Sequence, residues 1–190
     1  MKKSIGSKTI AFPAPVFIIG TYCEDGRPNA MNVAWGGICG SCPPAIAISV
    51  RKQRCTYDNI MRTNAFTVNI PSGEFVKEAD YFGIVSGKKA DKFQATGLTA
   101  VKGDKVNAPF IKEFPLNIEC KVIGIHEIGE HTQFVGEIMD IKVDQDCLDE
   151  DGTPDISKVD PMIYDTAAST YNSIGKMLAK AFFVGKEFVK

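Results

Sequence analysis

The amino-acid sequence predicts a mainly β fold in which antiparallel strands form the core and a few helices cover it. The strongest observation is a pair of long segments, 114–126 and 133–143, that alternate apolar and polar residues. Gly129 lies between them, as expected for the turn of a β-hairpin. A second observation is the β-rich run 15–23, which a Glu-Asp-Gly-Arg turn at 24–27 connects to the next apolar stretch.

Length and composition are those of a single globular domain. The chain has 190 residues with 44% hydrophobic content and contains no internal repeat or low-complexity segment. We therefore expect one domain over residues 1–190. Lys and Arg total 22 against 23 Asp and Glu, without a long basic run. Neither nucleic acid nor a membrane surface is therefore an expected partner.

The N-terminus contains basic residues but lacks the other features of a secretion signal. The apolar run 10–19 is short and is interrupted by Pro13 and Pro15. We therefore expect a cytoplasmic protein.

The stretch 27–37 combines apolar and amide side chains with the only Trp of the chain. Pro28 lacks a backbone donor, and Gly36 and Gly37 lower strand propensity. We therefore expect an irregular strand whose backbone groups are partly free for a ligand. A bulged core strand with Trp35 as a core aromatic is the alternative that these residues leave open.

A phosphate-binding site is predicted where the next strand ends. Residues 45–50 read as a short apolar strand, and Arg51 and Arg54 follow it. Thr56 is expected to cap a short helix, 57–63, whose first N–H groups have no intrahelical partners. Free N–H groups, a hydroxyl and guanidinium groups together suit a phosphate dianion. A solvated basic loop with an ordinary Thr cap is the alternative.

The following elements are assigned from the same patterns. Within the short helix, Ile60 and Met61 are expected to face the core. Residues 66–70 predict a strand, and 74–85 place apolar side chains at helical spacing, as in an amphipathic helix that covers a sheet. The segment 86–93 is a second cationic loop, and its three lysines are expected to be surface charges: Lys88, Lys89 and Lys92.

The six cysteines do not indicate a disulfide framework, because the chain is neither small nor visibly secreted. Only Cys39 and Cys42 are closely spaced, in a predicted loop at 39–44, and a zinc site would need a second pair of ligands. A redox dithiol would need a helix N-terminus, whereas Pro43 and Pro44 precede a strand. Buried thiols in a loop are the expected state, and a redox role for this pair stays open.

The remaining polar clusters do not predict metal sites. His126 and His131 lack the spacing of a zinc protease helix, in which the second His would replace Glu130. The acidic segment 144–155 lacks the ligand spacing of a calcium-binding loop and is expected to lie on the surface.

The C-terminal segment 161–190 is moderately hydrophobic and ends with a cluster of apolar side chains: Phe182, Phe183, Val184 and Phe188. Apolar surface of this kind has to be covered. A second subunit would cover it, as would packing back onto the core of the same chain.

The sequence lacks the common nucleotide-binding and hydrolase signatures and shows no obvious nucleophile with a neighbouring base. What remains is a β-rich domain with free backbone groups beside a Trp and a phosphate-like site. This combination suits a flat aromatic cofactor that bears a phosphate and supplies the chemistry itself.

Three motifs together resemble the flavin reductase-like, FMN-binding split-barrel family. They are Asn-Ala-Met-Asn-Val-Ala-Trp at 29–35, Ser-Val-Arg at 49–51 with Thr56 soon after, and Ser-Gly-Lys-Lys-Ala-Asp-Lys-Phe at 86–93. The resemblance covers nearly the whole chain. It implies an antiparallel, Greek-key-like split barrel that pairs as a homodimer, with FMN near the subunit boundary.

The resemblance also implies the residues of an FMN site. The isoalloxazine ring would be lined, chiefly through backbone atoms, by Asn29, Ala30, Met31, Asn32, Val33, Ala34 and Trp35. The ring and the ribityl chain would be flanked by Ser49, Val50 and Arg51. The phosphate would be held by Thr56 with Arg51 or Arg54, and the site would be closed by Ser86, Gly87 and Lys92. No catalytic side chain and no metal are implied, and the Cys39/Cys42 pair is not a motif of the family.

The implied function is electron transfer by an FMN-dependent oxidoreductase. Backbone N–H groups at one edge of the ring would stabilise the negative charge of the reduced flavin, so the protein needs no acid or base of its own. Electrons would come from a nicotinamide or from a redox protein. Two other classes stay open. One is a split-barrel protein that binds heme or a nucleotide without reductase activity, and the other is a structural or interaction domain.

Overall fold

The computed structural model describes residues 1–189, and most of its regular structure is β. The strands are β1 (Ala14–Pro15), β2 (Phe17–Tyr22), β3 (Pro28–Val33), β4 (Gly36–Ser41), β5 (Pro44–Arg51), β6 (Ala65–Ile70), β7 (Ala100–Lys102), β8 (Pro109–Ile111), β9 (Leu116–Ile128), β10 (His131–Val143), β11 (Met162–Asp165) and β12 (Thr170–Ser173). The helices are α1 (Cys55–Thr63), α2 (Val76–Ile84), α3 (Lys92–Thr96) and α4 (Ile156–Val159), with 3-10 turns at Gly73–Phe75, Gln145–Cys147 and Val184–Phe188.

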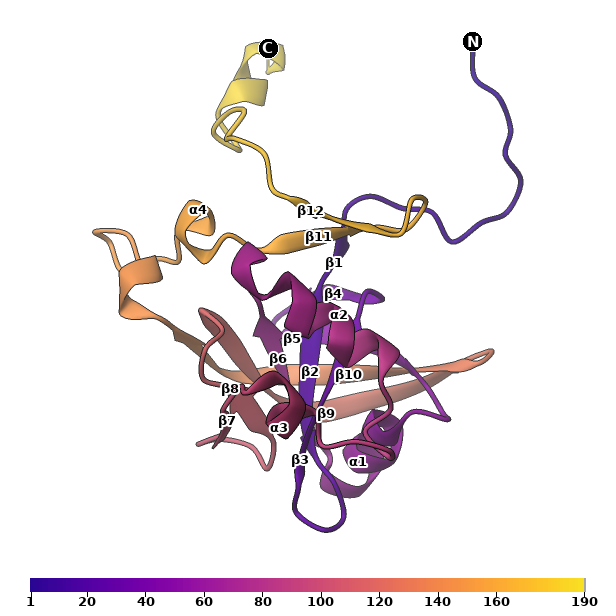
Figure 1. Ribbon diagram of the computed structural model, residues 1–190. Coiled ribbons are helices and arrows are strands. Elements are labelled where there is room, and N and C mark those ends of the chain that lie inside the picture. Colours follow the sequence, from indigo (N-terminus) through magenta and orange to yellow (C-terminus); the bar gives the residue numbers. More distant parts are fainter. Residues whose placement is uncertain (190) are drawn as a thin grey trace.

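The main sheet is antiparallel and open. Its seven strands lie in the order β3-β2-β6-β9-β10-β5-β4, and two smaller sheets have the orders β1-β11-β12 and β7-β8 (Figure 1). The edge strands β3 and β4 are not paired with each other, so the barrel stays split. The predicted fold class, a mainly β split barrel with a few covering helices, is confirmed.

The longest strands, β9 and β10, form the predicted hairpin. They pair antiparallel from Leu116 with Val143 to Ile128 with His131, and Gly129 in the turn has φ +55°. A positive φ is accessible to Gly without steric cost, which explains why the turn falls there. The hairpin joins the two halves of the sheet, because β9 pairs with β6 and β10 pairs with β5.

Two apolar clusters fill the two sides of the sheet. In β2, successive residues divide between them: Ile19 packs with Phe66 and Phe134, whereas Ile18 packs with Phe82 of α2 and Phe93 of α3. This division follows from the alternation of side chains along a strand. Helices α2 and α3 therefore cover one face of the sheet, as Figure 1 shows, and α2 confirms the predicted amphipathic helix.

The stretch predicted as one irregular strand is in fact two strands. β3 ends at Val33, the chain leaves the ladder at Ala34 and Trp35, and β4 begins at Gly36. Trp35 is 38% exposed, so it is not a core aromatic. The predicted loop at 39–44 is also wrong, because β4 continues to Ser41 and turns directly into β5.

Two details of the helix after β5 differ from the prediction. α1 begins at Cys55, so Thr56 is its second residue and does not cap it; Arg54 is the N-cap, without a side-chain hydrogen bond. Ile60 is buried as expected, but Met61 is 49% exposed. Adjacent residues in a helix lie about 100° apart, so Met61 lies at the edge of the buried face on which Ile60 is centred.

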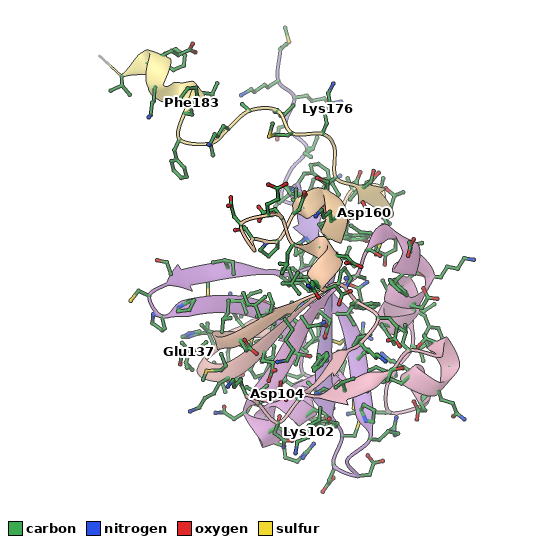
Figure 2. All side chains as sticks on the ribbon, turned by 90° about the vertical axis from the view of Figure 1, so that its left-hand side faces the viewer. Lys102, Asp104, Glu137, Asp160, Lys176 and Phe183 are labelled. Carbon is green, nitrogen blue, oxygen red and sulfur yellow. The ribbon has the colours of Figure 1, made fainter. Side chains whose placement is uncertain are left out.

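The two ends of the chain leave the body at the same side (Figure 1). Beyond β12, the C-terminal segment extends away from the sheet, and Figure 2 shows Phe183 and Lys176 at a distance from the body. Phe182 is 98% exposed, and its neighbours are exposed as well. The alternative in which segment 161–190 packs back onto its own core therefore holds for residues 162–173, where β11 pairs with β1 and Met162 is buried, and is wrong for the residues beyond β12. Within residues 1–189, no helix is both long and apolar enough to span a bilayer.

Candidate functional site

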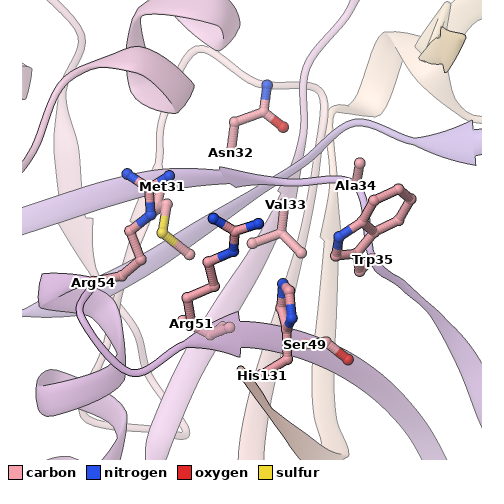
Figure 3. Close-up of a pocket in the computed structure, with 10 residues that line it drawn as sticks. Met31, Asn32, Val33, Ala34, Trp35, Ser49, Arg51, Arg54 and His131 are labelled. Atoms are coloured by element: carbon pink, nitrogen blue, oxygen red, sulfur yellow. The ribbon is translucent and has the colours of Figure 1, made fainter. Parts of the chain in front are cut away.

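A cavity of about 270 Å³ opens where β3 and β5 end. Its walls are drawn in Figure 3 and consist of Met31, Asn32, Val33, Ala34, Trp35, Ser49, Val50, Arg51, Arg54 and His131. The Ser49 N–H donates to the Trp35 carbonyl at 2.8 Å. This bond holds the irregular residues between β3 and β4 against β5. We call this space the ring cavity, because one wall is apolar and the opposite wall carries the two guanidinium groups.

A second, narrow cavity of about 10 Å³ adjoins the first. It lies between the start of α1 and the loop after α2, and it is lined by Asn29, Met31, Arg54, Cys55, Thr56, Val85, Ser86, Gly87 and Lys92. Met31 and Arg54 line both cavities. We call this space the phosphate cavity, because cations and hydroxyl groups surround it.

The predicted site residues are brought together almost completely. Ala30 is the exception, since it lines neither cavity. It is nevertheless buried, and its carbonyl accepts a hydrogen bond from the Lys92 ammonium at 2.7 Å. Residues from three separate segments, 29–35, 49–56 and 86–92, thus meet around two adjoining cavities, although nothing in their sequence separation requires it.

Lys92 is not the surface charge that its loop predicted. Its side chain is only 2% exposed, and its ammonium donates to the Ala30 carbonyl at 2.7 Å and to the Phe82 carbonyl at 3.0 Å. Burial, with a smaller contribution from the Arg54 charge, lowers the pKa of Lys92 to about 8. The third ammonium hydrogen has no acceptor among residues 1–189, so the site contains a buried cation that lacks a counter-ion.

Arg51 and Arg54 differ in what they contact. Both side chains point across the ring cavity towards β3 in Figure 3. The Arg51 guanidinium lies 3.9 Å from the Glu130 carboxylate. For Arg54, no hydrogen-bond or ion-pair partner of the side chain occurs in the described part of the chain, and this residue also lines the phosphate cavity. Arg54 is therefore the better placed of the two for a phosphate.

Asn29 lines the phosphate cavity, and only part of its hydrogen-bonding capacity is used. Its amide donates to the Thr56 hydroxyl at 3.1 Å, whereas its Oδ1 is buried and has no donor among the described residues. Gly87 lies directly against it, since a Cβ at Gly87 would be 1.9 Å from that oxygen. An unpaired buried acceptor costs free energy, so this oxygen suits a hydroxyl group of a ligand.

His131 is a wall residue that the sequence analysis missed. In the sequence, its spacing from His126 excludes a zinc protease helix and indicates no other role. In the structure, His131 pairs with Arg51 across the β10 and β5 ladder and faces the ring cavity. Only the antiparallel register of β5 and β10 places His131 beside Arg51, and the local sequence around either residue does not specify that register.

A third, largely apolar cavity of about 400 Å³ shares a wall with the ring cavity. The N-terminal residues Lys8, Thr9, Ile10 and Ala11 form its outer side, and Trp35, Ser49 and His131 separate it from the ring cavity. A second apolar molecule in this cavity would therefore lie next to a planar group in the ring cavity, on the other side of Trp35, Ser49 and His131.

The closely spaced cysteines do not belong to these cavities. Cys39 and Cys42 are both exposed on the β4–β5 hairpin, so the expectation of buried thiols in a loop is wrong for this pair. Within residues 1–189, no group of three or more His, Cys, Asp or Glu side chains is arranged to hold a metal ion.

Comparison with known proteins identifies the family. The model of the flavin reductase like domain matches residues 9–173. Flavoredoxin of Desulfovibrio vulgaris (Miyazaki F) is similar in structure, with a TM-score of 0.95, 54% identity and coverage of 98% of this chain and 100% of that one. Flavoredoxin from Methanosarcina acetivorans has a TM-score of 0.92, 33% identity and coverage of 98% of both chains. An uncharacterized protein of Archaeoglobus fulgidus is 34% identical over 146 residues, which are 77% of this chain and 80% of that protein. The chain therefore belongs to the flavin reductase-like family, and its fold and relatives support a flavin-binding redox function.

Proposed function

We propose that the protein binds FMN across the ring and phosphate cavities and transfers electrons between a donor and an acceptor, as a flavoredoxin-like flavoprotein. The observation that carries this proposal is that the two cavities adjoin each other. They share Met31 and Arg54, one is apolar on one side, and the other is lined by cations. A planar ring joined to a single phosphate by a polar chain matches this sequence of environments.

The residues present fit each part of FMN. Val33, Ala34 and Trp35 line the ring cavity with an apolar wall, and Ala34 and Trp35 lie outside the strand ladder. Their backbone N–H groups are therefore candidates to donate to the polar edge of the ring. The unpaired Asn29 Oδ1 suits a ribityl hydroxyl group, and Lys92 with Arg54 supplies positive charge for the phosphate.

The narrow phosphate cavity means that binding requires a local movement. A volume of about 10 Å³ accommodates about one water molecule. The Arg54 side chain, which contacts no partner in the described residues, is the group expected to swing aside and then close on the phosphate. Lys92 is held by two carbonyl groups and is expected to stay in place.

When bound, FMN supplies the redox chemistry through its ring. The protein orients the ring, and the apolar cavity beside Trp35 is the candidate place for a donor or an acceptor next to the ring. A nicotinamide or a redox protein is the proposed donor. The positively charged wall formed by Arg51 and Arg54 would favour negative charge that accumulates on the ring during reduction.

We further propose that the protein is a homodimer, with the C-terminal segment covering the partner. Several large apolar side chains of this segment are exposed: Met177, Leu178, Phe182, Phe183 and Phe188. Several large apolar side chains exposed together on one segment are uncommon on a monomer and are typical of a subunit interface.

Purification without added cofactor tests the proposed function. We expect a yellow protein whose extract contains FMN by chromatography, and reduction of the bound flavin by NADH, NADPH or reduced ferredoxin in an anaerobic stopped-flow experiment. Recovery of FAD alone would contradict the assigned cofactor. Recovery of heme or of a nucleotide that is not a flavin would instead favour a split-barrel binding protein without reductase activity.

A further inference from the structure

Two cysteines that are far apart in sequence lie side by side beneath the start of α1. The Sγ atoms of Cys23 and Cys55 are 3.7 Å apart. Cys23 follows β2 and is 7% exposed, whereas Cys55 is the first residue of α1 and is partly exposed. The amide nitrogen of Asn59 lies 3.7 Å from both sulfur atoms and donates to each.

Both thiols border a cavity that is separate from the ring cavity. This cavity has a volume of about 670 Å³, and its wall contains Cys23 and Cys55. Three cationic side chains and three carboxylates complete the wall: Arg27, Arg62 and Lys88 with Glu24, Asp25 and Asp58. Lys88 pairs with Asp58 and Arg27 with Asp25 in this wall, so a small zwitterionic molecule beside the thiol pair would exchange these exposed ion pairs for its own.

We propose that Cys23 and Cys55 form a redox-active dithiol that low-molecular-weight disulfides oxidise to an intramolecular disulfide. Neither thiol lines the ring cavity, although Cys55 also lines the phosphate cavity, so the proposal does not depend on which ring occupies the site. It also differs from the sequence-based hypothesis, which considered only Cys39 and Cys42 as a redox pair.

The reaction takes place in two exchange steps. The Cys55 thiolate attacks one sulfur of the small disulfide, forms a mixed disulfide, and releases the other half as a thiol. Cys23 then loses its proton, attacks the Cys55 sulfur, and releases the second half as a thiol. The protein loses two electrons and two protons, and the small disulfide gains them. The two Sγ atoms move from 3.7 Å to a bonded distance of about 2 Å.

The burial of the two thiols decides their roles. Cys55 is the more exposed and is the attacking thiol, whereas the buried Cys23 resolves the mixed disulfide. Burial, together with the neighbouring Cys23, raises the pKa of Cys55 to about 11. Little thiolate is present at neutral pH, so the exchange is measured at mildly alkaline pH, where its rate is higher.

The test uses the full-length holoprotein with the two exposed thiols removed, C39S/C42S, and glutathione disulfide as the probe. After incubation, intact mass should show a loss of two hydrogens per chain. Proteolysis without reduction should yield one peptide pair that joins Cys23 to Cys55, and dithiothreitol should separate it. Adding Cys23→Ser should stop the reaction at one glutathione bound to Cys55, and adding Cys55→Ser should abolish the adduct.

Two outcomes overturn the proposal. One is a stable glutathione adduct on Cys55 while Cys23 is present, because a resolving thiol would have displaced it. The other is unreacted Cys23 and Cys55 in the folded protein under conditions in which the urea-unfolded protein reacts. Both outcomes are read from C39S/C42S alone, so misfolding of a Cys23 or Cys55 variant does not affect the conclusion.

Discussion

The ammonium of Lys92 is joined to the carbonyl of Ala30 by a hydrogen bond of 2.7 Å, although 62 residues separate them. This bond connects the first residue of α3 to the middle of β3, and a second bond to the Phe82 carbonyl connects it to α2. The loop over the phosphate cavity is therefore tied to the strand that lines the ring cavity. Lys92 holds the two halves of the site in register, together with Arg27, which donates to the Gly87 and Ala90 carbonyls of the same loop.

The first prediction concerns the pH dependence that this buried cation imposes on the protein without cofactor. The folded pKa of Lys92 is about 8, below the ordinary value of 10.5. Between these values the unfolded chain binds more protons than the folded one, so stability rises with pH across this window. Below pH 8 the Lys92 ammonium is charged in both the folded and the unfolded chain, so the full free-energy cost of burying this charge lowers the stability of the fold. That cost is about 1.4 kcal/mol per unit of pKa difference. Urea unfolding of the apoprotein at several pH values measures the slope.

The control variants isolate Lys92 from other groups that titrate in the same window. Lys92→Met should remove most of the rise in stability between pH 8 and 10.5. Lys89→Met, at an exposed position in the same loop, should retain it. An equal slope in both variants would assign the effect to another group.

The second prediction separates the two arginines. Arg54→Ala should weaken FMN binding by roughly 1.5–3 kcal/mol, the range for a hydrogen bond to a charged group, or about ten- to hundred-fold in Kd. Arg51→Ala should weaken it less, because Arg51 lines only the ring cavity and lies near Glu130. Titration of the apoproteins with FMN gives both dissociation constants. A larger loss for Arg51→Ala would place the phosphate beside Arg51 instead.

The third prediction concerns the contact between Gly87 and Asn29. A Cβ at Gly87 would lie 1.9 Å from Asn29 Oδ1, so Gly87→Ala must displace the amide or the loop. Overpacking of this kind costs about 1–3 kcal/mol, and we expect FMN affinity to fall by about ten-fold or more. Gly37→Ala is the matched control, because a Cβ there has no atom within 4 Å. Equal affinities of the two variants would show that the loop does not close on FMN.

The fourth prediction concerns assembly. If a second subunit completes the site, free FMN fluorescence should rise on dilution only as sedimentation or light scattering shows the dimer dissociating. A chain that ends at residue 173, where the family match ends, lacks the exposed apolar segment and should be monomeric. A full-length monomer that keeps FMN at every concentration would falsify the proposed dimer.

Local periodicity was sufficient to predict the elements whose structure depends on near neighbours. The β9–β10 hairpin follows from alternation around Gly129, and α2 follows from apolar residues at helical spacing. Each pattern reflects burial on one side of a single element, which is a property that sequence records directly.

Features that depend on distant packing were not visible in the local pattern. Lys92 reads as one of three loop lysines, and only the neighbouring Phe82 and Ala30 carbonyls make its burial possible. Thr56 reads as a helix cap, but its hydroxyl accepts a hydrogen bond from Asn29. His131 enters the ring cavity through the register of β5 and β10. The three family motifs nevertheless predicted residues that surround the two adjoining cavities. A family motif reflects the residues of a whole binding site and not the pattern of one helix or strand.

The position of Trp35 gives the protein a built-in optical reporter. It is the only Trp in the chain, and it forms part of the wall of the ring cavity. All indole fluorescence therefore originates at the proposed ring site. Flavin absorbs light at the wavelengths at which indole emits, so energy transfer to a bound ring quenches this emission. Loading and loss of the cofactor can thus be followed in real time on the unlabelled protein, without a correction for other tryptophans.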